Sequence, residues 1–459
     1  MSVLSLPSLR KGTFARGLHL PDRKELSADL PIEVLPAPPE VRIAMLQHLG
    51  APCLPAVKPR TEVALGDVVG SAEAFVSAPV HASICGTTAR DSVATLPNGR
   101  HVPVVPIRAA EEQPFAGRAL FEEIFGGPWP LEAVEQLPPA EIARAARQAG
   151  LVGLGGAAFP AHVKLTRLED KPIGLVVING CECEPYLTAD YRLMIEAPRP
   201  VIAGALLARH AVGADHVLVA VEDNKPEAVH ALREAAEGTA VGIRVLATKY
   251  PQGGEKQLIR AVTGRRVPLG GLPLDVGVVV FNVGTTAALA RAVLRNKPLT
   301  HRIVTVSGAA IRQPGNLLVP IGTSYGRLIE HCGGLADDAA AVAAGGPMMG
   351  FAIAIDDDSS HAMEVPITKG TSGITVLSQS DVDHAEETPC VRCGRCVQVC
   401  PMLLVPTRLA LAARRNQLDD LRRYHVTACM ECGCCAYACP ARIPLVQLIR
   451  MGKVMMQKK

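Results

Sequence analysis

Two stretches near the end of the chain decide the fold of that region: CVRCGRCVQVCP at Cys390–Pro401 and CMECGCCAYACP at Cys429–Pro440. In each, two residues separate the first three cysteines, a fourth cysteine follows after three more residues, and a proline comes next. The second stretch begins 39 residues after the first, so the region is an internal repeat. It contains nine of the 14 cysteines, which marks it as a site of metal chemistry.

The cysteine spacing predicts two 4Fe–4S clusters, because three thiolates of such a run bind one cluster and the fourth binds the other. We therefore expect a first cysteine set of Cys390, Cys393, Cys396 and Cys439, and a second cysteine set of Cys429, Cys432, Cys435 and Cys400. The alternative is two zinc sites, since zinc also accepts four thiolates, but zinc rarely uses such a run twice. Cys434 is out of register and is interpreted as a small filler.

The segment that joins the two stretches, Met402–Ala428, predicts helices rather than strands. It is rich in good helix formers and has apolar residues at Leu411, Leu418 and Leu421. We expect a helical module in which the two clusters lie close together and can pass electrons.

The composition bounds the rest of the chain. Its 459 residues correspond to about three domains at roughly 150 residues each. With 48% hydrophobic and 20% charged residues, it can bury large cores and is not disordered. Aromatic residues are only 3% and the formal net charge is +3, so neither stacking platforms nor a basic surface for nucleic acid is indicated.

The amino-terminal residues MSVLSLPSLRKGTFARG contain no apolar run followed by a cleavage site, so we expect no secretory signal. Without export, disulfides are not expected, and the cysteines should be free or metal-bound. No run reaches about 18 apolar residues, so we expect no transmembrane helix. These features favour a cytoplasmic protein that is soluble or peripheral.

The middle of the chain alternates between strand and helix patterns, which favours a parallel α/β sheet covered on both faces. A first helix is expected to begin at Pro138 and end at Gly150. The following elements are expected as strands at 173–179, 215–221, 241–247 and 275–281, with helices at 196–212 and 225–237.

The flanking segments have a different pattern. Short apolar runs separated by Gly, Pro and Asp turns predict a small all-β unit that begins near Ala51. A proline-rich linker is expected at 108–137, and residues 302–365 return to short strands and turns.

The loop Gly153–Phe159, GLGGAAF, matches the dinucleotide fingerprint at Gly153, Gly155 and Ala158. That fingerprint should follow a strand and open a helix, whereas here a helix precedes the loop and a strand follows it. A Rossmann turn is therefore not expected. The glycines can still present backbone N–H groups to a phosphate, and the alternative is a plain turn.

Four motifs in a fixed order carry a resemblance to a known family. They are GLVGLGGAAFPAHVKL (Gly150–Leu165), VINGCECEPYLTADYRLM (Val177–Met194), YPQGGEKQLI (Tyr250–Ile259) and FNVGT (Phe281–Thr285). Together they resemble the NADH- and flavin-binding subunit of respiratory complex I. They resemble still more closely the C subunit of the Rnf electron transport complex.

The resemblance covers nearly the whole chain. GLHLPDRKELS (Gly17–Ser27) and SAPVHASICGT (Ser77–Thr87) resemble the amino-terminal domain of that family, a biotinyl-like sandwich hybrid. The segment Arg302–Ser324 resembles the β-grasp domain that follows the flavin domain.

The resemblance implies a multidomain α/β chain with four domains. They are a β sandwich-hybrid domain (1–125), an α/β FMN/NADH domain (126–296), a β-grasp, SLBB-like domain (297–378) and an α-helical double 4Fe–4S ferredoxin domain (379–459).

The same resemblance implies residues for non-covalent FMN and for NADH. For FMN they are Gly153, Gly155, Gly156, Lys164, Asn179, Gly253, Gly254, Glu255, Asn282 and Thr285. Glu182 and Glu184 match acidic residues beside the nicotinamide and its ribose, and are the candidate catalytic pair. The family loop usually reads GGAGFP, and Ala158 here replaces its last glycine. If that position needs a positive φ, alanine costs about 1 kcal/mol or more.

Several of these residues have a plainer interpretation. Glu182 and Glu184 could be surface carboxylates, and Lys164 could be a solvated helix charge. His19 and His81 are expected to be structural. The cysteines without ligand spacing are expected to be small core residues: Cys53, Cys85, Cys181, Cys183 and Cys332.

The resemblance implies an NADH-dependent flavin/iron–sulfur oxidoreductase that is a peripheral subunit of a membrane-bound ion-translocating complex. Its expected partners are NADH, ferredoxin, the membrane subunits and a ferredoxin-like iron–sulfur subunit, on the cytoplasmic face of the inner membrane. One alternative is a soluble cobalamin reductase of the propanediol-utilisation type, which shares the flavin region and the cluster pair. The complete amino-terminal domain favours the Rnf family. A flavin-free electron-wire scaffold is a second alternative, supported only by Ala158.

Overall fold

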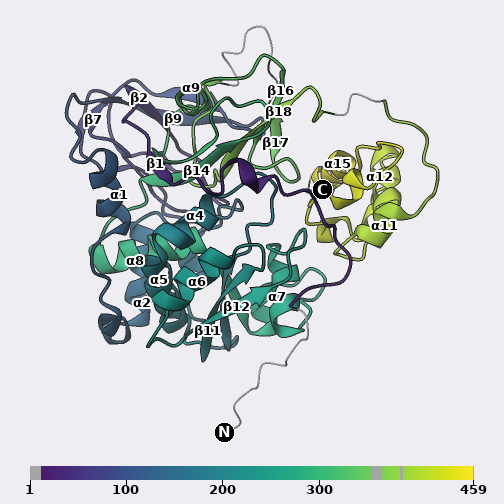
Figure 1. The fold of residues 1–459 in the computed structure, drawn as a ribbon, viewed down its shortest axis with the longest axis horizontal. Coiled ribbons are helices and arrows are strands. Elements are labelled where there is room, and N and C mark those ends of the chain that lie inside the picture. The colour runs from purple at the N-terminus through teal and green to yellow at the C-terminus, as the bar shows by residue number, and fades with distance from the viewer. Residues whose placement is uncertain (1–11, 354, 356–362, 383–385, 458–459) are drawn as a thin grey trace.

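The fold was obtained as a computed structural model that describes residues 12–353, 355, 363–382 and 386–457. Residues 1–11, part of the stretch used to infer that no secretory signal is present, lie outside this range. The chain forms a large body of three units and a smaller helical lobe beside it (Figure 1). Among the described residues, no helix is long and apolar enough to cross a bilayer.

The α/β unit is built on a four-stranded parallel sheet with the order β12-β11-β10-β13. Its strands are β10 (Leu175–Gly180), β11 (His216–Glu222), β12 (Val241–Leu246) and β13 (Val278–Asn282). Its helices are α1 (Gly117–Phe125), α2 (Pro139–Gln148), α3 (Ala161–Leu165), α4 (Ala189–Glu196), α5 (Pro198–Val212), α6 (Pro226–Ala235), α7 (Glu255–Thr263) and α8 (Val283–Arg295). The predicted alternation of strands and helices is confirmed.

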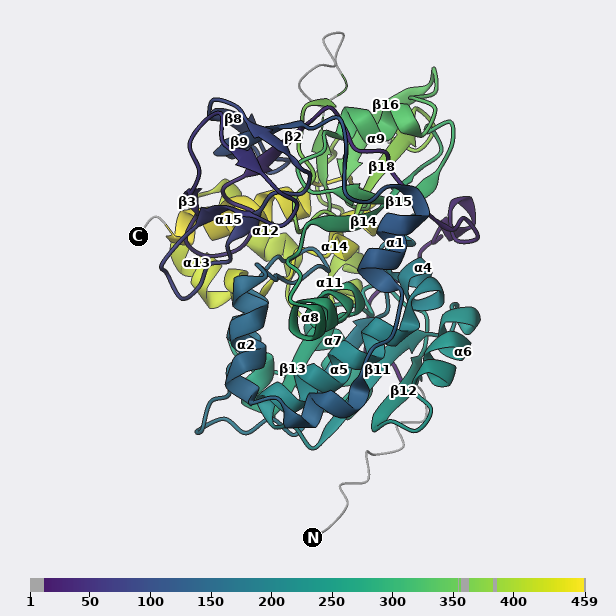
Figure 2. The ribbon, with the colours of Figure 1, turned by 90° about the vertical axis from the view of Figure 1, so that its left-hand side faces the viewer.

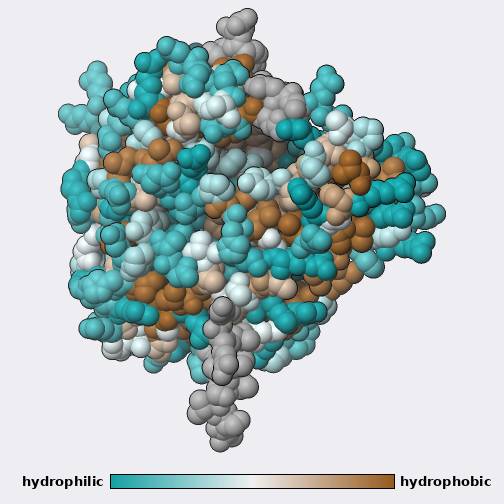
Figure 3. Space-filling view, turned by 45° about the vertical axis from the view of Figure 1, so that its right-hand side comes forward, coloured by the Kyte–Doolittle hydropathy of each residue, from teal (hydrophilic) through white to brown (hydrophobic). Residues whose placement is uncertain are grey.

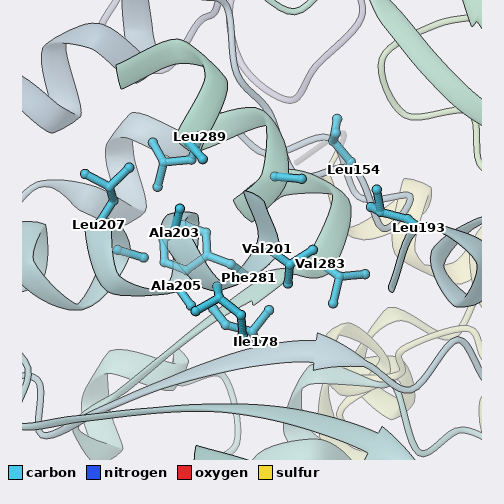
Figure 4. Packing of buried hydrophobic residues seen from close by; sticks show 14 of the residues in the cluster. Leu154, Ile178, Leu193, Val201, Ala203, Ala205, Leu207, Phe281, Val283 and Leu289 are labelled. Carbon is cyan, nitrogen blue, oxygen red and sulfur yellow. The ribbon is translucent and has the colours of Figure 1, made fainter. Parts of the chain in front are cut away.

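Alternate side chains of β10 enter different cores, as a strand buried on both faces requires. Val176 and Ile178 pack with α5, α6 and α8, whereas Leu175 and Val177 pack with α7 on the opposite face. Figure 4 shows α5 and α8 stacked over the sheet residues Ile178 and Phe281. The two helices approach closely because Gly204 has no Cβ, which would otherwise overlap the Thr286 carbonyl oxygen.

The proline-rich linker expected at 108–137 is a wrong prediction in part, because it contains the helix α1 and the 3-10 turn Leu131–Gln136. Leu120, Phe121 and Ile124 of α1 are buried in the core of the α/β unit. Their apolar stripe has the i, i+1, i+4 spacing of a helix. The prolines and glycines that follow it obscured this short pattern.

The amino-terminal β unit has two small antiparallel sheets around a shared core that includes Val41, Ile43 and Ile107. Its strands are β2 (Glu40–Ala44), β3 (Leu54–Pro55), β4 (Glu62–Val63), β5 (Val68–Ser71), β6 (Val80–His81), β7 (Gly86–Thr88), β8 (Ser92–Thr95) and β9 (His101–Ala109). The expected all-β unit is present, and it lies with the third unit above the α/β unit in Figure 2.

The third unit is a six-stranded mixed sheet with the order β1-β15-β14-β18-β16-β17. Its elements are β1 (Ile32–Val34), β14 (His301–Ser307), β15 (Gly315–Pro320), α9 (Tyr325–His331), β16 (Ala339–Ala344), β17 (Phe351–Ile353) and β18 (Gly373–Ser378). The strand β1 comes from the amino-terminal segment and pairs in parallel with β15, so this segment connects separate units of the fold.

The carboxyl-terminal lobe is helical, as expected, and we refer to it as the ferredoxin module. Its elements are α11 (Arg395–Val399), α12 (Pro406–Arg414), α13 (Leu418–Arg423), the 3-10 turn Val426–Ala428, α14 (Cys434–Tyr437) and α15 (Leu445–Gln457). Leu421 is fully buried in the module, while Leu411 is exposed and its neighbour Leu409 takes the core position.

Candidate functional site

The candidate flavin site lies at the carboxyl edge of the parallel sheet. The chain leaves β10 towards β11 and β12 on one side and returns to β13 on the other, so the topology switches between β10 and β13. Ligands in open α/β sheets bind at such a point. Asn179 and Asn282 are register partners at the ends of these two strands. Two of the predicted flavin residues are therefore neighbours at the place where the fold favours a ligand.

The glycine loop covers this edge. Its ends are closed by the hydrogen bond from the Gly153 N–H to the Phe159 carbonyl (2.8 Å), and the Leu154 N–H donates to Thr285 Oγ1 (2.9 Å). A Cβ on Gly155 would lie 3.3 Å from Asn282 Cβ. At Gly156 a Cβ would meet no atom within 4 Å. The loop thus rests on the start of α8 and leaves open space beside Gly156, which suits a bound cofactor.

Ala158 has a φ of 50°, so the position that carries glycine in the family is left-handed in this chain. An alanine in this conformation costs about 1 kcal/mol. The loop lies between α2 and α3, so the prediction that a strand follows it directly is wrong. Because a helix and not a strand precedes the loop, it is not a Rossmann turn.

A second edge of the site is the turn Gly253–Glu255 at the start of α7. The Asn179 side chain donates to the Gly253 carbonyl (2.9 Å), and Lys164 Nζ forms an ion pair with Glu255 (2.7 Å). Lys164 also donates to the Val280 carbonyl of β13 (3.1 Å). Lys164 is therefore a half-buried cation at the sheet edge rather than a solvated helix charge.

The acidic pair Glu182 and Glu184 is held by backbone groups. Glu182 accepts hydrogen bonds from the N–H groups of Asp190 (2.8 Å) and Tyr191 (3.0 Å) at the start of α4. Glu184 accepts from the N–H groups of Met348 (2.7 Å) and Met349. Burial raises the pKa of Glu184, although these hydrogen bonds oppose the rise. Neither residue is a freely solvated surface carboxylate, and their role beside NADH stays a prediction.

Asp190 was not identified by sequence reasoning. It accepts a hydrogen bond from the Asn282 side chain (2.6 Å) and ties α4 to the end of β13. Burial, followed by the nearby Glu182, raises the pKa of Asp190 to about 7. The signal was available, since Asp190 lies in the first turn of α4 within one of the motifs that carry the resemblance.

Several thiols of the ferredoxin module lie close together, while their division into two ligand sets stays a prediction. Burial raises the pKa of Cys396, and the nearby Cys439 and Cys393 raise it further. Burial likewise raises the pKa of Cys435, with Cys429, Cys432 and Cys400 adding to the rise. Such mutual effects require close approach. Cys390 is exposed, and its place in the first set rests on the motif.

The second cysteine set surrounds a cavity lined by all four of its thiols and by Met402, Leu404 and Met430. In the described part of the chain, no three Cys, His, Asp or Glu side chains converge to hold a single ion. A cube-shaped cluster takes its ligands at separate corners, so thiols spread around a cavity fit a 4Fe–4S group.

The second set lies against the α/β unit. The Tyr250 hydroxyl donates to the Cys432 carbonyl (2.7 Å) and lies 3.3 Å from Glu184 Oε2. Tyr250 is 2% exposed and packs with Cys432, Cys434 and Met430. This contact connects the flavin-side turn, Gly253–Glu255, to the loop that contains Cys432. No sequence signal singled out Tyr250 for this contact.

The remaining cysteines and histidines have mixed outcomes. Cys53, Cys181, Cys332 and Cys434 are buried, as expected of structural residues. Cys85 and Cys183 are only partly buried, and Cys183 packs against the buried cluster around Tyr250. Cys183 accepts a hydrogen bond from the Gly253 N–H (3.3 Å), beside the candidate flavin site. His81 is buried and His19 is exposed.

Comparison with protein families matches four models along the chain. They are the RnfC barrel sandwich hybrid domain (residues 12–112), the Nuo51 FMN-binding domain (146–291), the SLBB domain (303–352) and the 4Fe-4S dicluster domain (386–443). These matches confirm the predicted fold class and support FMN and two 4Fe–4S clusters as cofactors. The first match falls on the amino-terminal domain that favoured the Rnf family over the cobalamin-reductase alternative.

Solved structures support the fold. Chains of an NAD+-reducing [NiFe]-hydrogenase, in the air-oxidised and H2-reduced states, are similar with a TM-score of 0.50 each. Their sequence identities are 21% and 23%, and the matches cover 73% and 72% of this chain and 66% and 67% of theirs.

Curated relatives match nearly the whole chain. The C subunit of a proton-translocating ferredoxin:NAD(+) oxidoreductase complex from Clostridium ljungdahlii is 42% identical over 95% of this chain and 93% of its own length. Its Na(+)-translocating counterpart from Acetobacterium woodii is 41% identical, covering 97% of both chains. The C subunit of an ion-translocating oxidoreductase complex from Rhodobacter capsulatus is 40% identical over 95% of this chain and 82% of its own. The chain therefore belongs to the family of C subunits of the ion-translocating (Rnf) oxidoreductase complexes.

Proposed function

We propose that the chain is the NADH-oxidising, peripheral subunit of a membrane-bound ion-translocating ferredoxin:NAD oxidoreductase. It exchanges electrons with NADH at the sheet edge and with partner subunits at the ferredoxin module. The proposal is supported by relatives named as ferredoxin:NAD oxidoreductase subunits and by the FMN-binding and dicluster matches. Its site on the cytoplasmic face of the membrane, with ferredoxin, membrane subunits and an iron–sulfur subunit as partners, is part of the same proposal.

One observation carries the proposal: the flavin-side turn and the second cysteine set are in direct contact. Tyr250 precedes the turn and hydrogen-bonds Cys432, while a Cβ on Gly254 would lie 2.7 Å from Met430 Cε. Because of this contact, we expect electrons to pass from the sheet edge to the second set and then to the first set. When bound, FMN supplies two-electron exchange with NADH and the clusters supply one-electron steps.

The residues of this chain hold and orient these groups. We assign FMN to the glycine loop, Asn179 and Asn282 with Thr285, and the turn Gly253–Glu255. The glycine loop offers backbone N–H groups, and Lys164 places a positive charge beside the site, which stabilises negative charge there. Glu182 and Glu184 are proposed to contact the nicotinamide side. The domain boundaries after residues 125, 296 and 378 belong to the same proposal.

Cofactor content and NADH response test this function. The purified chain should contain FMN and two 4Fe–4S clusters, and NADH should bleach the iron–sulfur absorbance. Gly156→Ala should lower the FMN content, because its Cβ enters the open space beside the loop. Gly238→Ala is the matched control, since Gly238 also has a positive φ and an open Cβ direction but lies after α6. Full clusters with no FMN and no NADH–dye activity would refute the proposal.

A further inference from the structure

The two cysteine stretches have the same backbone. Arg392 and Glu431 have φ values of 54° and 59°, and Gly394 and Gly433 have values of 76° and 80°. The residues of each pair are 39 apart, which is the offset of the repeat. The helices α12 and α15 also begin at corresponding positions. Each feature of one copy therefore has a counterpart in the other, and their surroundings can be compared directly.

In the second copy, the face that includes Met430 and Gly433 is an interface. Met430 packs against Gly254 at the start of α7. A Cβ on Gly433 would lie 2.7 Å from the Met348 carbonyl oxygen, and Cys434 has no exposed surface. The other units of the chain thus cover this face, where electrons enter the module under the proposed function.

In the first copy, the corresponding face is bare. Val391, the counterpart of Met430, is 66% exposed, and Arg392 and Arg395 are exposed where the second copy has Glu431 and the buried Cys434. Within the described ranges, neither arginine has an ion-pair or hydrogen-bond partner. In the described part of the amino-terminal segment, Arg16 and Gly17 donate hydrogen bonds to the carbonyls of Val397 and Val399 on α11.

We propose that Val391, Arg392 and Arg395 form the docking surface for an acidic iron–sulfur protein that exchanges electrons with the first cysteine set. The inference rests on the proposed function, since it names the partner chemistry at the exit of the same electron path. In the repeat, these residues correspond to the residues of the second copy that contact the other units of the chain. The first copy presents the same face outwards. We refer to these three residues as the exit face.

The charge of the exit face selects the partner. Two unpaired guanidinium groups around an exposed apolar residue attract carboxylates, and such charges raise association rates with an acidic surface. The two described acidic residues just before the motif do not cancel this charge, because Glu387 is paired with Arg414 (2.5 Å) and only Glu386 is left to face solvent unpaired. On its outer side the lobe is mainly hydrophilic with small apolar patches (Figure 3), as suits a transient contact.

The test measures binding of the full-length chain, with both clusters oxidised, to a purified acidic two-cluster ferredoxin. For Arg392→Glu/Arg395→Glu we expect an association rate about tenfold lower at low salt, and the salt dependence should be largely lost. Arg422→Glu/Arg423→Glu on α13 is the matched control, because it makes the same charge change on a helix that packs around the second set. This control should bind within about twofold of the unaltered chain. Unchanged iron content and cluster absorbance show that the variants assemble.

Two results would overturn the proposal. One is an equal effect of both double variants, or of neither, since the exit face would then have no special part in binding. The other is a loss of binding to phosphatidylglycerol vesicles with unchanged ferredoxin binding, which would make the face a membrane contact. The assay needs no NADH, so it is independent of the flavin site. Failure of the proposed function appears separately, as missing NADH-dependent bleaching in the unaltered chain.

Discussion

The first and second cysteine sets occupy two copies of one local structure, and they differ in almost everything around it. The α/β unit and the third unit cover one side of the second set, where Cys432 meets Tyr250 and Gly433 meets Met348. Cys432 and Cys435 are each 7% exposed. In the first set, Cys390 and Cys393 are exposed. The same motif therefore makes an inner and an outer site. The motif determines the ligand geometry, and the neighbouring units determine which site faces inwards.

The two copies also differ in how their charged side chains are paired. Glu431 of the second copy forms ion pairs with Arg450 (2.8 Å) and Lys453 (2.5 Å) of α15. Although burial opposes the shift, hydrogen bonds from these two cations lower the pKa of Glu431. Its counterpart Arg392 faces solvent. The second copy thus neutralises its charge within the chain, while the first copy presents its charge outwards.

The largest expected effect separates the two sets by electron entry. In both Cys432→Ala and Cys393→Ala, about half of the iron should be lost, because each removes a ligand of one cluster. With Cys393→Ala, NADH should still bleach the remaining cluster at nearly the normal rate. With Cys432→Ala, the bleaching should slow by several orders of magnitude, since electron transfer falls steeply with distance. Stopped-flow absorbance with EPR measures both rates, and FMN content is the control. Equal rates would reverse or abolish the order of the sets.

The second prediction compares how much alanine at two corresponding glycines, Gly394 and Gly433, lowers the free energy of unfolding. Gly394→Ala and Gly433→Ala both place alanine at a positive φ, which costs about 1 kcal/mol. At Gly394 the new Cβ meets no atom within 4 Å, whereas at Gly433 it approaches the Met348 carbonyl oxygen. The overlap should add about 1–3 kcal/mol for Gly433→Ala alone. Denaturant unfolding followed by cluster absorbance gives the difference, and equal losses would show that the interface does not constrain Gly433.

Removing one hydroxyl group tests the contact itself. Tyr250→Phe leaves the buried Cys432 carbonyl without its donor and should destabilise the chain by about 1–3 kcal/mol. The counterpart is Arg16→Gln, which removes an exposed hydrogen bond to the Val397 carbonyl in the first copy and should cost no more than about 0.5 kcal/mol. Thermal unfolding of the two variants checks the contrast. A larger loss for Arg16→Gln would mean that the amino-terminal segment, rather than Tyr250, holds the module.

Local spacing was sufficient to predict much of this molecule. The cysteine runs indicated two 4Fe–4S clusters, which the dicluster match supports. Alternating patterns indicated the parallel sheet, with strands close to their observed bounds. The sequence also showed where an alanine replaces the family glycine, and that residue, Ala158, has a positive φ. In each case the information lies within a short segment, because ligand spacing and backbone φ are local properties.

Long-range contacts could not be predicted in the same way. The hydrogen bond of Tyr250 to Cys432 and the pairing of β1 with β15 join residues far apart in the sequence. On α12, Leu409 is buried and Leu411 is exposed, although both are apolar. The packing of α12 within the ferredoxin module, and not apolar character, decides which of the two is buried. Long-range contacts also decide which of the two cysteine sets is exposed and which is buried. The cysteine spacing is the same in the two motifs, so the spacing does not distinguish an inner from an outer cluster.

The smallest expected effect is a change in the pH dependence of stability at the inner site. Burial raises the pKa of Glu184, so the folded state retains its proton more readily than the unfolded chain. Its stabilising contribution is therefore complete below the ordinary carboxyl pKa and is lost as the pH rises through the raised value. Glu184→Gln cannot ionise, so its stability should fall less with rising pH above about 4.5.

Asp190, whose pKa is about 7, contributes a part of the pH dependence of stability in both proteins, and Asp190→Asn should remove that part. Denaturant unfolding between acid and neutral pH measures the slopes. Arg392 is exposed and does not titrate in this pH range, so Arg392→Gln should leave the slope unchanged. A slope that is the same in Glu184→Gln as in the unaltered chain would show that the carboxyl already ionises freely in the folded state.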